Sequence, residues 1–152
     1  MDQKEKKMTD ISFGTELTNV NWTDVTQLLH SYGLTDLSED KIKLAFENSY
    51  RFVFVFDAEG QTVGVARAVS DGVTHAEIYN IALAEKYHHL GIGRQLFQRL
   101  VDQLDGMIVT LYTHPKTIEW YKSLGMSQLN TAMVLFRPHE KEWMLQEKFI
   151  DD

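Results

Sequence analysis

The segment from Ala76 to Leu104 most constrains the fold, because it combines a strand, a turn with two glycines and an amphipathic helix. Its first part is rich in β-favouring residues, and apolar residues then recur at helical spacing at positions 92, 96, 100 and 104. Gly91 and Gly93 lie where the turn becomes the helix, so no side chain covers the backbone N–H groups there. The first N–H groups of a helix lack partners and attract anions. The sequence therefore predicts an anion site at this turn.

Basic side chains around the turn support this prediction. Lys86, Arg94 and Arg99 outnumber Glu85, whereas the whole chain has a formal net charge of −7. A positive pocket on an acidic protein favours a phosphorylated ligand.

Two common phosphate-binding motifs do not fit the turn. A P-loop needs Gly-Lys-Ser/Thr, but Gly93 is followed by Arg94 and Gln95. A dinucleotide fingerprint needs a third glycine at position 96, where this chain has leucine. An ordinary strand–turn–helix, whose glycines only form the turn, stays open as the simple alternative.

The run His88-His89-Leu90-Gly91-Ile92-Gly93 resembles the Gln/Arg-x-x-Gly-x-Gly/Ala signature of the GNAT superfamily, the GCN5-related N-acetyltransferases. In that family the loop holds the pyrophosphate of acetyl-coenzyme A (acetyl-CoA). One departure is that histidine replaces the leading Gln/Arg. The resemblance implies coenzyme contacts from two stretches, namely Ile81, Ala82 and Leu83 on the strand and His88, His89, Leu90, Gly91, Ile92, Gly93 and Arg94 in the loop.

A second block lies downstream, where a buried-type strand at 107–112 precedes the sequence HPKTIEWYKSLGM at 114–126. It is similar to the family block Asn-x-x-Ala-x-x-Phe-Tyr-x-x-x-Gly-Phe, with His114 in the Asn position. The resemblance implies that Tyr121 contacts the coenzyme and is the acid near its sulfur, and that His114 lies beside the pantetheine arm. The alternative for Tyr121 is a core aromatic residue whose hydroxyl is satisfied.

Glu77 is the candidate general base, because it lies eleven residues before His88, where the similar histone-acetyltransferase branch has a glutamate. Alternatively, Glu77 faces solvent or pairs with Arg67 on the preceding strand. Asn80 stands where similar small bacterial members often have aspartate, which favours a water relay from Glu77 over a base at position 80.

The resemblance implies an N-acetyltransferase that moves an acetyl group from acetyl-CoA to a primary amine by direct attack. The acceptor is a small molecule, a lysine side chain or an N-terminal amine, and no motif identifies it. An N–H near Ile81 would polarise the developing oxyanion. Deprotonating a lysine-like amine at pH 7 costs roughly 4.6 kcal/mol, so a base or a desolvating pocket is needed. The alternative function is a non-catalytic acyl-CoA-binding or interaction module.

Composition agrees with a compact enzyme of 152 residues, with a mobile tail at 1–10 and one domain at 11–152. The chain has no cysteine, which suits the reducing cytoplasm. We expect no metal site, because the histidines lack ligand spacing. A pI near 5.3 argues against nucleic-acid binding. The tail lacks an apolar core, so we expect it not to be a secretion signal. No apolar run is long enough for a membrane span. The sequence does not decide whether the chain forms a homodimer.

The remaining patterns predict the order of a GNAT fold, an α/β (mixed α+β) architecture. A central, mostly antiparallel sheet would be splayed between two parallel strands and flanked by helices. The expected strands lie at 11–16, 51–57, 62–70, 74–83, 107–112, 126–128 and 132–137, and the expected helices lie at 21–32, 38–48, 92–104, 115–124 and 138–149.

Overall fold

The computed structural model describes residues 2, 3, 5, 10–137 and 139–152. The chain divides into two compact units, Met1–Leu111 and Tyr112–Asp152, and each is described by itself. The expected domain at 11–152 spans both units. Most of the expected tail at 1–10 lies outside the described residues, as does Pro138 at the expected start of the last helix.

The first unit is built on a five-stranded sheet in the order β1-β2-β3-β4-β5. The strands are β1 (Ser12–Gly14), β2 (Arg51–Phe56), β3 (Thr62–Ser70), β4 (His75–Leu83) and β5 (Ile108–Thr110). The pairs β1–β2, β2–β3 and β3–β4 are antiparallel, and β4–β5 is parallel. This arrangement confirms the predicted mixed sheet, although β1 and β5 are shorter than expected.

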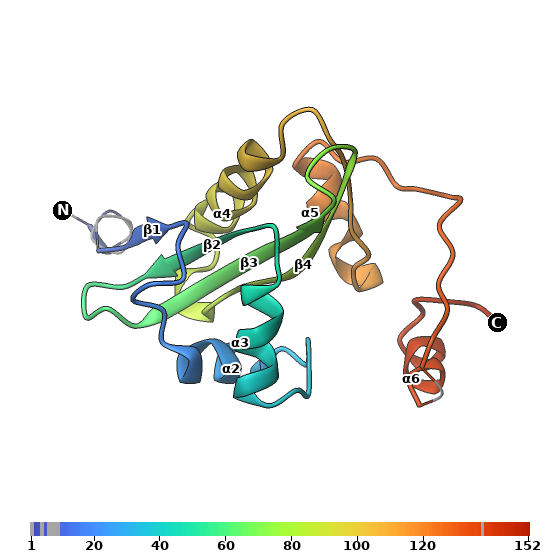
Figure 1. Ribbon diagram of the computed structural model, residues 1–152, viewed down its shortest axis with the longest axis horizontal. Helices are drawn as coiled ribbons and strands as arrows, with labels where there is room; N and C mark the ends of the chain where they lie inside the picture. The colour runs from blue at the N-terminus through green and yellow to red at the C-terminus, as the bar shows by residue number, and fades with distance from the viewer. Residues whose placement is uncertain (1, 4, 6–9, 138) are drawn as a thin grey trace. The chain divides into compact units, whose positions relative to one another are not determined.

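Three helices flank this sheet, namely α2 (Trp22–Ser31), α3 (Glu39–Glu47) and α4 (Ile92–Val101). Local caps fix where the first two begin, because the side chains of Asn21 and Ser38 accept hydrogen bonds from the N–H groups of Asp24 and Lys41. Figure 1 shows α2 and α3 on one face of the sheet and α4 on the other. A 3₁₀ turn at Asp102–Leu104 continues α4 to the predicted end.

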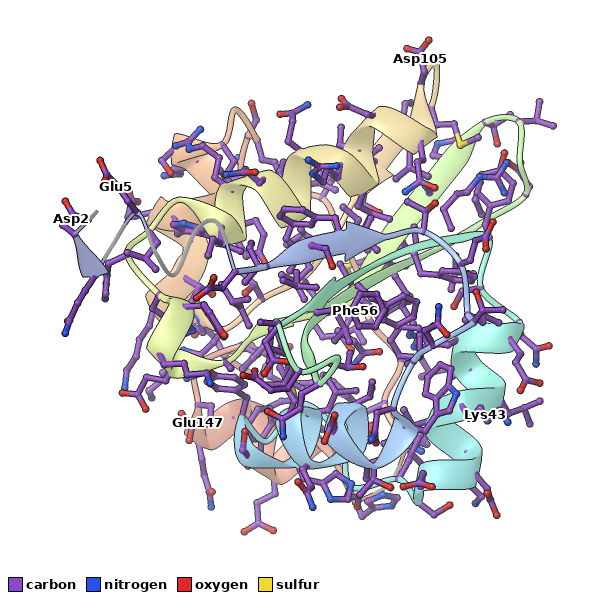
Figure 2. The ribbon with its side chains drawn as sticks, turned by 90° about the vertical axis from the view of Figure 1, so that its left-hand side faces the viewer. Asp2, Glu5, Lys43, Phe56, Asp105 and Glu147 are labelled. Atoms are coloured by element: carbon purple, nitrogen blue, oxygen red, sulfur yellow. The ribbon has the colours of Figure 1, made fainter. Side chains whose placement is uncertain are left out.

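Successive side chains of β2 point to opposite faces of the sheet. Phe54 is fully buried and packs with Phe46 of α3 and Trp22 of α2. Phe52 and Phe56 pack against the same cluster. Figure 2 labels Phe56 on the sheet and Lys43 on α3, whose side chain points away from the sheet. The face covered by α2 and α3 is therefore aromatic.

A β-bulge interrupts the pairing of β3 with β4. Val65 lies opposite Ala82 and Arg67 lies opposite Tyr79, so Asn80 and Ile81 together face the single residue between Val65 and Arg67. Asn80 has a left-handed backbone with φ of 57°, a conformation that asparagine tolerates better than most residues. Bulges of this kind change the direction of side chains and are frequent beside active sites.

The second unit contains a 3₁₀ turn at Pro115–Thr117, α5 (Ile118–Ser123) and α6 (Lys141–Gln146). Helix α5 ends close to the predicted end at 124, because Gly125 follows it with a left-handed φ of 98°. Helix α6 ends three residues earlier than predicted. Lys148 there has φ of 65°, and the N–H of Phe149 donates to the carbonyl of Met144, which is a Schellman ending.

The two strands predicted at 126–128 and 132–137 are wrong, because the structure has no strand in either stretch. Several large apolar side chains of this segment are exposed instead. Met133 is 95% exposed and Leu135 is 99% exposed. A strand needs a neighbour to bond its peptide groups, and this segment has no such neighbour among the described residues.

Candidate functional site

The turn before α4 has the geometry expected for an anion site. Gly91 precedes the helix with φ of 81°, and no side chain caps the helix start. An added Cβ at Gly91 would meet nothing within 4 Å, so the corner is open. The first helical bond runs from the N–H of Gln95 to the carbonyl of Gly91, and the N–H groups of Ile92 and Gly93 precede it. This open helix start can accept a phosphate group.

The positive charges divide between the two ends of α4. Arg94 lies in the first turn and is exposed. Arg99 lies in the last turn, where its guanidinium is 4.1 Å from the ring of Phe13 on β1. The expectation that Arg99 adds to the charge at the glycine turn is therefore wrong. Lys86 and Arg94 are the basic residues next to the turn in sequence.

His88 belongs to a polar cluster that the sequence did not predict. Its Nε2 lies 3.1 Å from the phenol oxygen of Tyr32 and 2.7 Å from the carbonyl oxygen of Leu83. Tyr32 donates a second hydrogen bond of 2.7 Å to the same carbonyl. Burial, with a smaller contribution from Glu85, raises the pKa of Tyr32, so its phenol remains a donor. The two side chains tie the end of α2 to the turn that leads to α4.

Strand β4 extends beyond its neighbour β5. The parallel pairing joins only His75, Ala76 and Glu77 to Ile108, Val109 and Thr110. Among the described residues, no strand pairs with positions 78–83 of β4 on the β5 side, and these positions contain the predicted coenzyme contacts at 81–83. The carbonyl of Leu83 already accepts two hydrogen bonds. The peptide groups around Ile81 are therefore better placed than that carbonyl to form hydrogen bonds with an extended ligand.

Glu77 lies at the last paired position of β4, opposite Thr110 on β5 and Val69 on β3. Its side chain is half-buried. The ion pairs among the described residues do not include Glu77 with Arg67. Arg67 lies opposite Tyr79 and donates to Asn80 and Ser49 instead. The alternative of a Glu77–Arg67 pair is thus not realised.

The second unit holds the other two predicted site residues. Burial raises the pKa of Tyr121 to about 12, and a hydrogen bond with Thr113 opposes this effect. His114 uses both ring nitrogens inside the unit, because Nδ1 accepts from the N–H of Lys116 and Nε2 lies 2.9 Å from Oε2 of Glu147. A neutral Tyr121 phenol is suited to donate a proton.

Within the described ranges, no three His, Cys, Asp or Glu side chains gather in a way that could hold a metal ion. The same ranges contain no helix with both the length and the apolar character needed to cross a membrane.

This chain is similar to proteins of one known family. The model of the acetyltransferase (GNAT) family matches residues 16–126. An uncharacterised N-acetyltransferase, ycf52 of Pyropia yezoensis, is 31% identical over 113 residues, which is 70% of this chain and 65% of that protein. Serotonin N-acetyltransferase 2 (chloroplastic) of Oryza sativa subsp. japonica is 31% identical over 102 residues, which is 62% of this chain and 50% of that protein.

A solved structure agrees with these relatives. A protein of Deinococcus radiodurans R1, for which acetyltransferase activity has been suggested, superposes with a TM-score of 0.75 and 26% identity. The match covers 86% of this chain and 90% of that one. The chain spans less than two thirds of the length of the two sequence relatives, at 65% and 50%.

Proposed function

Because this chain belongs to the GNAT family of acetyltransferases, we propose that it moves an acetyl group from acetyl-CoA to a primary amine by direct attack. The amine nitrogen attacks the thioester carbonyl, a C–N bond forms, and the C–S bond then breaks. The amine loses a proton to a base, and the leaving thiolate gains one from an acid. The products are an acetamide and coenzyme A.

The observation that carries the proposal is the open, uncapped start of α4 at Gly91, which lies close in sequence to the stretch of β4 beyond its pairing with β5. A diphosphate suits the first feature, because it needs N–H donors and space where a Cβ would otherwise stand. An extended amide-containing arm suits the second, because β5 pairs only with positions 75–77 and no described strand continues that pairing along β4. Acetyl-CoA carries both groups.

Glu77 and Tyr121 are the residues that we assign to proton transfer. Glu77 is half-buried at the point where β5 stops pairing, so it lies beside the stretch of β4 beyond that pairing. We propose that it removes the proton from the amine directly or through a water. Tyr121 keeps its proton because burial raises its pKa, and we propose that it protonates the thiolate. The Ile81 peptide N–H would stabilise the oxyanion.

Release of free thiol from acetyl-CoA tests the proposal. The acceptor panel should contain polyamines, arylalkylamines, amino acids and peptides with a free N-terminus or lysine. Serotonin belongs in it, because one relative is a serotonin N-acetyltransferase. We expect amine-dependent thiol release and a mass increase of one acetyl group on the acceptor. Tight binding of acetyl-CoA without turnover on any amine would instead support the acyl-CoA-binding module.

A further inference from the structure

Arg67 is a half-buried arginine that lacks an acidic partner. None of the ion pairs formed by the described residues includes it, although the chain has 22 acidic residues against 15 lysines and arginines. Burial lowers the pKa of its guanidinium, but arginine remains charged in proteins. A cation removed from water in this way is stabilised when an anion reaches it.

Neutral groups hold the guanidinium in one position. Nε donates to Oδ1 of Asn80 at 2.6 Å, and Nη1 donates to the hydroxyl of Ser49 at 3.3 Å. The Ser49 hydroxyl is itself fixed, because it donates to the carbonyl of Ala45 at 2.7 Å. The rings of Tyr79 and Phe46 lie 5.0 and 5.8 Å from the guanidinium carbon. These contacts orient the charge without neutralising it.

One end of the guanidinium is available to a ligand. Nη2 makes none of the hydrogen bonds found for Arg67 among the described residues. Among all the residues that the structure describes, Oδ2 of Asp57 is the only fully buried side-chain oxygen or nitrogen without a hydrogen-bond partner. Nη2 is therefore not fully buried, and its N–H groups can donate to the oxygen of a ligand.

The guanidinium of Arg67 lies beside the part of β4 that extends beyond β5. Its partner Asn80 belongs to the bulge, three residues beyond Glu77, where β4 has already lost β5. Phe52 of β2 lies directly opposite Arg67 and shares its face of the sheet. A molecule held by Arg67 would thus lie among aromatic rings beside the strand that carries Glu77.

We propose that Arg67 binds a carboxylate of the acetyl acceptor, so that the substrate is an amine that also carries a carboxylate, separated from it by an apolar spacer. This inference rests on the proposed acetyl transfer. Nη2 and the second N–H of Nη1 form the fork that matches a carboxylate. The amide at position 80 keeps the site receptive, because an aspartate there would occupy Arg67 with an internal ion pair.

Matched acceptor pairs test the proposal. Straight-chain ω-amino acids of increasing length are compared with their primary amides, because the two members share a primary amine, whose pKa values converge as the chain lengthens, and differ in the distal charge. We expect kcat/KM to favour the acid by about tenfold at the best length, as one charge-assisted hydrogen bond would give. Equal values for acid and amide at every length, in an enzyme that acetylates both, would overturn the carboxylate site and leave the proposed function intact.

Variants assign the preference to Arg67. Arg67→Gln and Asn80→Asp should each reduce the acid-to-amide ratio to about one, the first by removing the charge and the second by neutralising it internally. Asn80→Asp keeps Arg67, and aspartate also tolerates the left-handed backbone. Arg51→Gln is the control, because Arg51 is exposed and donates to the carbonyl of Tyr50. An unchanged ratio in both Arg67→Gln and Asn80→Asp would refute the proposal.

A binding measurement makes the test independent of turnover. The ¹⁵N–¹H signal of Arg67 Nε is followed while the unreactive N-acetylated ω-amino acid, and separately its amide, is added to the full chain. We expect the acid to shift this signal in a saturable way and the amide to leave it in place. If no amine is acetylated but the acid still shifts the signal, the transferase proposal fails and the carboxylate site stands. No shift with any acid would overturn the site.

Discussion

The phenol oxygen of Tyr32 and Nε2 of His88 lie 3.1 Å apart, and both lie 2.7 Å from the carbonyl oxygen of Leu83. Their rings are stacked, with an angle of 15° between the planes. The three groups come from the end of α2, the end of β4 and the turn before α4. The position of the glycine turn is thereby linked to the helix that covers the opposite face of the sheet.

Tyr32→Phe should loosen this link. The variant removes one hydroxyl and leaves Nε2 of His88 with the Leu83 carbonyl alone, so we expect a loss of about 1 kcal/mol in the free energy of unfolding. Acetyl-CoA affinity should fall a few-fold, because the turn is less fixed before binding. Urea unfolding and isothermal titration measure the two effects. Tyr50→Phe is the control, since the described residues offer its hydroxyl no hydrogen bond; equal effects in both variants would contradict the link.

Gly91→Ala should separate backbone strain from ligand binding. Gly91 and Gly60 have φ of 81° and 80°, and a Cβ would meet nothing within 4 Å at either position. Each alanine variant should therefore lose about 1–2 kcal/mol of stability for the left-handed backbone alone. Only Gly91→Ala should also weaken acetyl-CoA binding, by tenfold or more, because its Cβ occupies the space meant for the diphosphate. Equal affinities in the two variants would argue against an anion site at Gly91.

Tyr121→Phe should remove the acid without disturbing coenzyme binding. We expect turnover to fall by about 10²–10⁴-fold, the usual contribution of a positioned proton donor, with less than a threefold change in acetyl-CoA affinity. Steady-state kinetics and equilibrium titration give the two values. Tyr112→Phe, at an exposed tyrosine of the same unit, serves as the comparison. Turnover of Tyr121→Phe at the wild-type rate would remove Tyr121 from the mechanism.

The pH dependence follows from the raised pKa of Tyr121, which is about 12 against an ordinary value of 10.0. The phenol keeps its proton below that pKa, so the acid stays loaded while a rising pH deprotonates the amine. For a lysine-like acceptor, kcat/KM should rise up to about pH 10 without an alkaline decline. Because the folded pKa exceeds the unfolded one, the stability contributed by Tyr121 is full below pH 10 and is lost as pH rises toward 12. A decline in kcat/KM near pH 8 would contradict this assignment.

The exposed segment at 132–137 should drive self-association. Replacing both Met133 and Leu135 with lysine should reduce concentration-dependent light scattering, because charged side chains then replace two large apolar ones on the surface. The free energy of unfolding should stay within about 0.5 kcal/mol, as for other surface substitutions. Val73→Lys is the control, since Val73 is 74% exposed but stands alone at the β3–β4 hairpin. Scattering that stays the same in the double variant would contradict the expectation.

The elements that could be predicted from sequence are those whose signals act over a few residues. Asn21 and Ser38 cap their own helices, and Gly91 and Gly125 adopt left-handed backbones beside helix ends. Each signal needs no distant partner, so the sequence alone reveals it. The strands predicted at 126–128 and 132–137 failed for the opposite reason. Their composition favours a strand, but a strand forms only where another segment bonds it.

The same distinction between local and distant signals applies to the candidate site. The glycine turn and β4 form one continuous segment, and they were found from spacing. Tyr32 and His88 are 56 positions apart, and nothing in either stretch indicates the other. Arg67 reaches Asn80 because the bulge inserts one extra residue in β4. A regular register would have given Arg67 a different neighbour, so its role required the structure.

The short pairing of β5 has a consequence for how the chain resists heat and proteases. Beyond Glu77, the described residues provide no strand that pairs with β4 on its β5 side, and under the proposed function the amides of pantetheine would take the place of that strand. A ligand that binds the folded state alone at 100 times its Kd adds about 2.7 kcal/mol of stability. Under the proposed function, the lifetime of this protein in a cell would follow the concentration of acetyl-CoA. A fall in that concentration would lower both the amount of folded enzyme and the rate of its reaction.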